Sequence, residues 1–459
     1  MDRTREPVVN TIAEWVCSLS GRAIAENVRE VATTCLIDTL GVGLAGSRTS
    51  VAEKARSLIS ETSAAGLAEV LGGSALFSAP AAAFANACAS HALDFDDNSY
   101  AAFVHGSAVI IPAVLAVSQQ LDLAGDELLT GIIAGSEAQY AVGVAATNSI
   151  YDRGWWTTGV FGPIGASASA AYLMKLTPKQ TANALGIAIA ATGGMKACCG
   201  TDAKALMAGK AAEAGVVAAL LAARGVTGPC NVIESTTGFS HLFTNSTFQI
   251  DRLQLPGETW RLLEPGVDVK RIPVCFSSHA AVEAVLDLVD RLKIEVSQIR
   301  RIECDVPPIV VANLIYDKPT TGQQAQFSIQ YAIAASLYFG KLSFAELEPE
   351  AVNAPAIRQL INIIDMVSSD YWNDLEKRHN APEGAFVRLT LSDGRQHGHF
   401  QAFPRGAASE PLSSSEIDDK FLACAVHAGF RDASRLLSKL RSIRDLKTTR
   451  HLLAAACMN

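Results

Sequence analysis

The stretch from Asp202 to Gly225 reads DAKALMAGKAAEAGVVAALLAARG and predicts one long helix. Asp202 is a residue type that caps the start of helices, and Gly225 is the type that ends them. Small residues recur along the stretch, among them Ala208, Gly209 and Gly215. Because such residues let a neighbouring helix approach the backbone closely, this stretch indicates a protein built from tightly packed helices.

The composition of the whole chain excludes some classes of function. The 459 residues exceed the size at which one hydrophobic core usually gives way to two. Hydrophobic residues make up 49% and charged residues 18%, with a net charge of -8. Since an acidic chain without a long Lys/Arg run offers no basic face, no nucleic-acid partner is expected.

Cysteine usage and hydropathy predict the cellular compartment of the protein. Ten cysteines are scattered from Cys17 to Cys457 without a C-x-x-C pair, which is typical of a reducing environment. The first fifteen residues lack the apolar core of a signal peptide. A long uncharged stretch, 155–174, holds glycines, serines and Pro163, so it predicts a buried turn and helix rather than a membrane span. We expect a cytoplasmic protein that does not bind membranes.

The first 265 residues or so read as helix after helix. Thr177-Pro178-Lys179-Gln180 forms a capping box at the start of one of them. The predicted helices are 8–19, 24–40, 80–93, 127–142, 178–190 and 202–223.

The pattern changes after about Gly266. Residues 299–306 alternate like a strand, and 385–391 and 397–403 alternate around the turn Asp393-Gly394. Helices are predicted at 279–292 and 327–338, and Ser413-x-x-Glu416 opens a further one that leads into a helical tail. The predicted fold is mainly α: a large all-helical domain of residues 1–265 plus 405–459, and a smaller α/β domain of residues 266–404.

The densest group of reactive side chains is SHALDFDDN at 90–98, followed by His105. The preceding helix should end near Leu93, which places three carboxylates at its negative end and is expected to raise their pKa values. His105 precedes the next helix, whose dipole favours a neutral imidazole able to accept a proton. Alternatively, the aspartates only cap and turn the chain while His105 satisfies a carbonyl. A magnesium site is disfavoured because the spacing is not D-D-x-x-D.

Two basic positions suit an anionic ligand. Lys204 follows the start of the long helix, where free N–H groups favour carboxylates. Lys270-Arg271 lies at the expected domain junction and either closes over an anion or forms an ordinary charge pair. The segment 157–165 resembles a glycine-rich loop before a helix but follows no strand, so it predicts no nucleotide site. We therefore expect no cofactor and no metal.

Taken together, these motifs resemble the MmgE/PrpD family, which includes 2-methylcitrate dehydratase, cis-aconitate decarboxylase and iminodisuccinate epimerase. The resemblance covers essentially the whole chain. It implies a two-domain homodimer without cofactor, with the active site between the domains. The motifs that carry it are LIDTLGV (36–42), HALDFDD (91–97), HGSAVIIPA (105–113), GVFGPIGA (159–166), AGKAA (208–212) and the set Lys270-x-x-Pro273-x-Cys275-x-x-Ser278-His279.

The resemblance also implies roles for individual residues. His105, Lys204, Asp94 and Tyr316 match catalytic positions, and Lys270 a substrate-binding one. Three further substrate-binding positions depart from the usual residue. Asn98 stands where threonine is common, Trp156 where G-x-H-x-T-G has histidine, and Cys275 where the decarboxylases carry another histidine.

The predicted activity is removal of a proton α to a carboxylate of a small polycarboxylic acid, with the charge held by Lys204. The favoured reaction is that of a carbon-oxygen lyase similar to 2-methylcitrate dehydratase. An epimerase or isomerase of the iminodisuccinate type is the second hypothesis. A helical scaffold that has kept the fold and lost the chemistry is the non-enzymatic alternative, favoured by Trp156 and disfavoured by the retained His105, Lys204 and Asp94.

Overall fold

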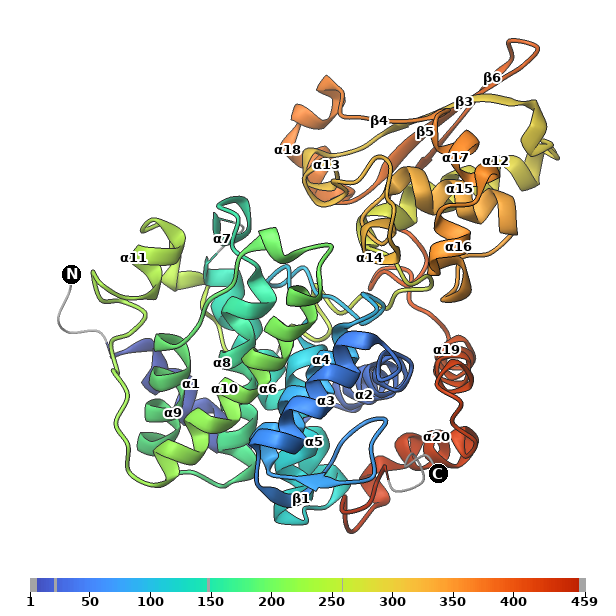
Figure 1. The fold of residues 1–459 in the computed structure, drawn as a ribbon. Helices are drawn as coiled ribbons and strands as arrows, with labels where there is room; N and C mark the ends of the chain where they lie inside the picture. Colours follow the sequence, from blue (N-terminus) through green and yellow to red (C-terminus); the bar gives the residue numbers. More distant parts are fainter. Residues whose placement is uncertain (1–5, 20–22, 147–148, 258, 454–459) are drawn as a thin grey trace.

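The computed structural model describes residues 6–19, 23–146, 149–257 and 259–453. The chain is mostly helical with a small amount of sheet, which confirms the expected fold class at this level. Figure 1 shows a large helical body and a smaller body that carries the main sheet.

Alanine- and glycine-rich helices form the large body. Its main hydrophobic cluster is built from residues between Val8 and Val269 together with residues between Leu412 and Leu453, and a small second cluster joins Val42, Ala45, Phe95 and Cys424. The elements are α1 (Val8–Ser18), α2 (Glu26–Gly46), α3 (Ser50–Thr62), the short hairpin β1 (Ala65–Glu69) and β2 (Leu76–Phe77), α4 (Ala79–His91), α5 (Ser107–Leu121), α6 (Gly125–Ala146), α7 (Ser149–Asp152), α8 (Thr157–Leu173), α9 (Pro178–Ala190), α10 (Asp202–Ala223) and α11 (Phe239–Thr244).

Helix α10 packs against α4, α8 and α9 and has the predicted bounds. A Cβ at Gly209 would lie 2.4 Å from the sulfur of Cys88, and one at Gly215 would lie 2.4 Å from Ala166. The small residues therefore do allow the close approach that the sequence indicates. The helix is long and apolar enough to cross a membrane, but 56% of the apolar stretch is buried within the protein, so it is weak evidence for a span.

The smaller body has its own hydrophobic cluster, formed by residues between Val274 and Leu391. Its sheet has the order β4-β3-β5-β6; β3 pairs parallel with β4 and antiparallel with β5, which pairs antiparallel with β6. Helices α12 and α15 lie on one side of this sheet in Figure 1. The elements are α12 (His279–Leu292), β3 (Ile299–Asp305), α13 (Pro308–Asn313), α14 (Gly322–Ala325), α15 (Ile329–Phe339), α16 (Pro349–Val352), α17 (Pro355–Ile361), β4 (Ile364–Val367), α18 (Leu375–Asn380), β5 (Ala385–Leu391) and β6 (Gln396–Gln401).

The C-terminal tail returns to the large body, as the sequence predicts. Helices α19 (Ser414–His427) and α20 (Ala433–Arg441) lie beside α2. Lys420 of α19 forms a buried ion pair with Asp38 of α2 at 2.6 Å. The residue boundaries proposed for the two domains stay a prediction.

Two local predictions are wrong. The cap of α10 is Thr201, and Asp202 is its first helical residue. The segment 157–165 is not a loop but the buried first half of α8. Its glycines face other elements: a Cβ at Gly165 would lie 2.6 Å from the amide oxygen of Gln139. Close packing thus explains these glycines, and backbone flexibility does not.

Candidate functional site

A cavity of about 310 Å³ opens between the two bodies. The large body contributes Asp94 and His105 from the loop between α4 and α5, and Lys204 from the first turn of α10. The smaller body contributes Asn313, at the end of α13, and Glu383, just before β5. The site therefore exists only where the two bodies meet.

The structure brings together every predicted site residue except Tyr316. Lining the cavity are Asp94, Asn98, His105, Trp156, Lys204, Lys270 and Cys275. Tyr316 does not line it; its hydroxyl points toward the carbonyl oxygen of Cys199, 3.5 Å away, and Cys199 does line the cavity. Its catalytic role stays a prediction.

Asp94 lies at the centre of the charged end of the cavity. Its φ of 49° is left-handed, a conformation that aspartate tolerates better than most residues, and it follows the end of α4. One carboxylate oxygen accepts a hydrogen bond from Lys204, and the other lies 3.2 Å from the ammonium of Lys270. Lys270 also donates to the Asp94 carbonyl oxygen at 2.7 Å. Burial alone would raise the pKa of Asp94, but Lys204 and Lys270 hold it below its usual value.

Of the pair Lys270-Arg271, only the lysine belongs to the site. Lys270 is fully buried. Arg271 is exposed and pairs with Glu283 at 3.0 Å. Two ammonium groups thus share the one carboxylate of Asp94.

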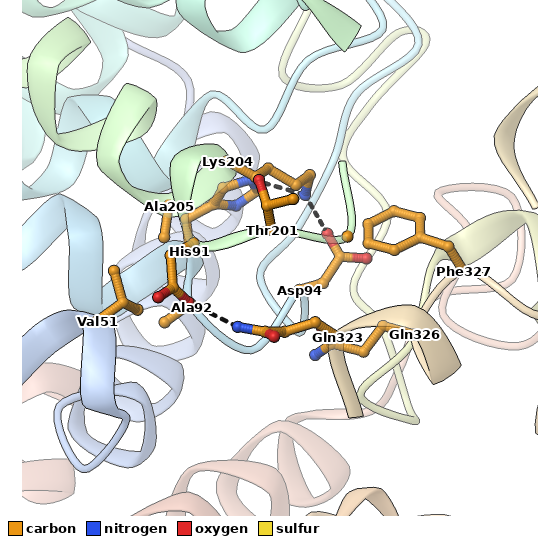
Figure 2. Close-up of a pocket in the computed structure, with 12 residues that line it drawn as sticks. Val51, His91, Ala92, Asp94, Thr201, Lys204, Ala205, Gln323, Gln326 and Phe327 are labelled. Atoms are coloured by element: carbon orange, nitrogen blue, oxygen red, sulfur yellow. Dashed lines mark hydrogen bonds and ion pairs between the residues drawn. The ribbon is translucent and has the colours of Figure 1, made fainter. Parts of the chain in front are cut away.

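His91, in the motif that the sequence singled out but not among the predicted site residues, lies beside Lys204. Figure 2 shows the lysine between His91 and Asp94. The lysine nitrogen is 2.8 Å from His91 Nε2, and His91 Nδ1 is 2.8 Å from Asp96 Oδ2. Burial lowers the pKa of His91 to about 4, although Asp96 opposes the shift. The imidazole is therefore neutral: it accepts from the ammonium at Nε2 and donates from Nδ1 to Asp96.

His105 presents one ring nitrogen to the cavity. Its Nδ1 lies 2.9 Å from the carbonyl oxygen of Asp97 and 3.4 Å from Asp96 Oδ2. Since a carbonyl oxygen only accepts, Nδ1 carries a hydrogen, and Nε2 is the ring nitrogen left to accept a proton. Nε2 lies 4.0 Å from Asp94 Oδ1. Its geometry is that of a base aimed at the charged end of the cavity.

The predicted rise in carboxylate pKa holds for only one of the three aspartates. The pKa of Asp97 rises to about 8, mainly through burial and then through Asp38. The pKa values of Asp94 and Asp96 fall instead. Although burial opposes the change, Asp96 is held low by His91 and His105. The lysines that act on Asp94 come from elsewhere in the fold, and the histidines that act on Asp96 lie close to it in the sequence; in both cases these partners outweigh the helix end on which the prediction rested.

Trp156 and Cys275, the two residues that stand where the family motifs have histidine, both line the cavity. Trp156 forms an apolar wall, and Cys275 carries a neutral thiol. Trp156 precedes α8, and its ring lies 5.3 Å from that of His91. The pKa of the Cys275 thiol rises to about 12, mainly through burial and then through Asp94. Neither group exchanges a proton readily near neutral pH.

The smaller body contributes a carboxylate that the sequence did not reveal. Glu383 accepts hydrogen bonds from the hydroxyls of Tyr100 and Ser277, and lies 3.4 Å from the amide nitrogen of Asn313. The amide oxygen of Asn313 in turn accepts from Lys196 at 3.3 Å. A lone glutamate in Pro382-Glu383-Gly384 has no neighbouring pattern to mark it, so only the fold could place it here.

One group of side chains has the composition of a metal site. Ligand atoms of His91, Asp96 and His105 lie within 4.8 Å of one another. However, both Nδ1 atoms already donate hydrogen bonds, and His91 Nε2 faces the ammonium of Lys204. A cation here would have to displace these contacts. The expectation of a metal-free site stays a prediction.

Comparison with known proteins identifies the class of protein that has this fold and site. Residues 10–251 match the MmgE/PrpD N-terminal domain and residues 272–442 match the MmgE/PrpD C-terminal domain. Together these matches cover most of the chain. The protein belongs to the MmgE/PrpD family.

Among its relatives are several proteins named as cis-aconitate decarboxylases. The chain is 27% identical to a cis-aconitate decarboxylase-like protein of Aspergillus oryzae, over 96% of this chain and 95% of the relative. It is 25% identical to the human cis-aconitate decarboxylase and 25% identical to that of Aspergillus terreus, in each case over 96% of this chain and 92% of the relative.

Proposed function

We propose that this protein is a cofactor-independent lyase that acts on a small polycarboxylic acid and begins by removing a proton α to a carboxylate. The finer proposal is a hydro-lyase similar to 2-methylcitrate dehydratase. The observation that carries it is the arrangement of Lys204 and Lys270 around Asp94, beside the free Nε2 of His105.

The two lysines are suited to hold the charge that develops when such a proton leaves. Each ammonium has three N–H bonds. Within the described residues, Lys204 donates to Asp94 and His91, and Lys270 donates to two atoms of Asp94. Each lysine therefore keeps an N–H for a carboxylate that becomes an enediolate. Donors held in place before the reaction stabilise such charge without reorganising.

His105 supplies the proton path. Its Nε2 takes the α proton, and the C–H electrons move into the neighbouring carboxylate to form the enediolate. The enediolate then collapses to the alkene as the β C–O bond breaks, and the leaving hydroxide takes the same proton from His105. Water departs, and His105 returns to its neutral form. One base is enough for the elimination, because the proton that His105 removes from carbon is the proton that it gives to the leaving hydroxide.

Decarboxylation is the second candidate, because the quoted relatives are named as cis-aconitate decarboxylases. It would break a C–C bond and deliver a proton to carbon. Trp156 and Cys275 occupy positions where the resemblance places histidines in that subgroup, and both line the cavity. His91 is a second histidine near the site, but it lies behind Lys204. These features favour the hydro-lyase, and epimerisation through the same carbanion is the remaining alternative.

The test is a panel of acids incubated with the purified protein in D₂O and followed by NMR. The panel contains citrate, 2-methylcitrate, cis-aconitate and iminodisuccinate. Loss of hydroxyl with formation of an alkene supports the hydro-lyase. Inversion with deuterium uptake indicates an epimerase, and carbon dioxide release indicates a decarboxylase. Neither turnover nor exchange with any acid would overturn the proposal and favour the non-catalytic scaffold.

A further inference from the structure

We propose that His91, held by Asp96, is a positioning residue that fixes the direction of the Lys204 ammonium toward the substrate cavity. The proposal rests on the proposed function, since it assigns His91 a role in the same reaction. His91 does not contact the bound acid in this scheme and acts only through the lysine.

The hydrogen bonds run in one direction through this group. Lys204 donates to His91 Nε2 at 2.8 Å, and His91 Nδ1 donates to Asp96 at 2.8 Å. An ammonium has no acceptor, so Nε2 must hold the lone pair. The carboxylate of Asp96 accepts and thereby selects this tautomer. Carboxylates commonly fix the tautomer and orientation of a functional imidazole in this way.

The location of His91 separates it from the substrate. Its side chain is fully buried, as is that of Asp96. It is not among the residues that line the 310 Å³ cavity, whereas Lys204 is. Instead it borders a small cavity of about 20 Å³ on another side of Lys204, together with Thr201 and Phe327 (Figure 2).

Two acceptors decide where the third N–H of Lys204 points. With both Asp94 and His91 in place, two N–H directions are set and tetrahedral geometry sets the third. With Asp94 alone, the torsions of the lysine side chain are free to swing Cε and the other N–H bonds about that single hydrogen bond. A donor that moves in this way must be ordered during the reaction, and this raises the barrier to the chemical step.

Two substitutions separate positioning from simple support of the fold. The amide of glutamine reaches about as far as Nε2, so His91→Gln keeps an acceptor for Lys204. The amide of asparagine reaches only about as far as Nδ1, so His91→Asn keeps the contact with Asp96 and loses the one with Lys204. We expect His91→Asn to lower kcat by about 10²-fold with little change in KM, and His91→Gln to retain most of kcat.

His279 offers a matched control. It is equally buried, and its ring nitrogen lies 3.3 Å from the Val274 carbonyl oxygen, outside the cavity lining. His279→Asn should lower the melting temperature without lowering kcat of the folded enzyme. Equal kcat losses in His91→Asn and His91→Gln, or a normal kcat in His91→Asn, would overturn the positioning role.

A second measurement keeps the test independent of activity and of variant folding. In ¹⁵N-histidine-labelled wild-type protein, His91 should show a protonated Nδ1 and an unprotonated Nε2, identified as the signal missing from His91→Gln. A protonated Nε2 would rule the proposal out. If wild-type protein converted no acid in the panel, the proposed function would fail, whereas this spectrum would still decide whether His91 accepts from Lys204 and donates to Asp96.

Discussion

Replacing Lys204 by methionine tests the central claim about the charged end of the cavity. Methionine keeps most of the length of the side chain and removes the charge. Lys204 is 7% exposed, and its ammonium contacts both Asp94 and His91. The substitution therefore removes one donor to the substrate and one of the two cations of Asp94.

The contacts of Lys204 set the size of the expected losses of kcat and of stability. A lost donor that stabilises transition-state charge costs about 10²–10³ in kcat, or roughly 2.7–4 kcal/mol. Breaking a buried ion pair by removing one partner costs about 3–5 kcal/mol of stability when the remaining charge has no other partner. Asp94 keeps Lys270 at 3.2 Å, so the loss of stability should fall below that range.

Acid unfolding gives the same substitution an independent signature. The pKa of Asp94 is depressed in the folded protein. Its contribution to stability is therefore present above the unfolded pKa of about 4 and is lost as the pH falls below it. In Lys204→Met the folded pKa of Asp94 rises, so this contribution shrinks and less stability is lost on acidification.

The assay combines steady-state kinetics with urea unfolding at pH 7 and pH 3. Lys210→Met is the matched control, because Lys210 lies on the same helix with its ammonium paired to Glu213 at the surface. Near-normal kcat in folded Lys204→Met would refute the role of the ammonium. An unchanged stability difference between the two pH values would refute its effect on Asp94.

Four further outcomes are expected. Dialysis against a strong chelator should leave turnover unchanged. A loss of activity that a divalent cation restores would contradict the prediction that the enzyme needs no metal. His105→Ala should lower kcat by about 10²–10⁴-fold, as loss of a general base does, and near-normal turnover of the folded variant would exclude that role. Wild-type protein should convert cis-aconitate to itaconate much more slowly than it dehydrates its best substrate, because Trp156 and Cys275 replace proton-exchanging groups; comparable rates measured by NMR would contradict this. Asp97→Asn should raise the melting temperature at pH 8 but not at pH 5: the folded pKa of Asp97 is raised to about 8 by burial, so stability falls as the pH rises from about 4 to 8. An equal effect at both values would show that Asp97 does not titrate in this range.

Local patterns were enough to predict much of the fold. Helices 178–190, 202–223 and 279–292 and strand 385–391 have the predicted bounds. In these segments the hydrophobic periodicity, the residues at the ends and the packing in the folded protein all favour the same helix or strand. The segment 157–165 was misassigned because glycine is ambiguous in a sequence: it marks a flexible loop or a helix face against which another element packs.

By itself, the sequence determined the helical class of the protein, the family motifs and the residues that line the charged end of the cavity. Each of these features depends on residues that are close together in the chain, as in HALDFDD. Only the tertiary structure decided which groups act on one another. The low pKa of Asp94, the place of His91 beside Lys204 and the presence of Glu383 in the cavity lining each depend on residues distant in the chain. Electrostatic and hydrogen-bonding energies depend on distances in space, and no local pattern of residues specifies them.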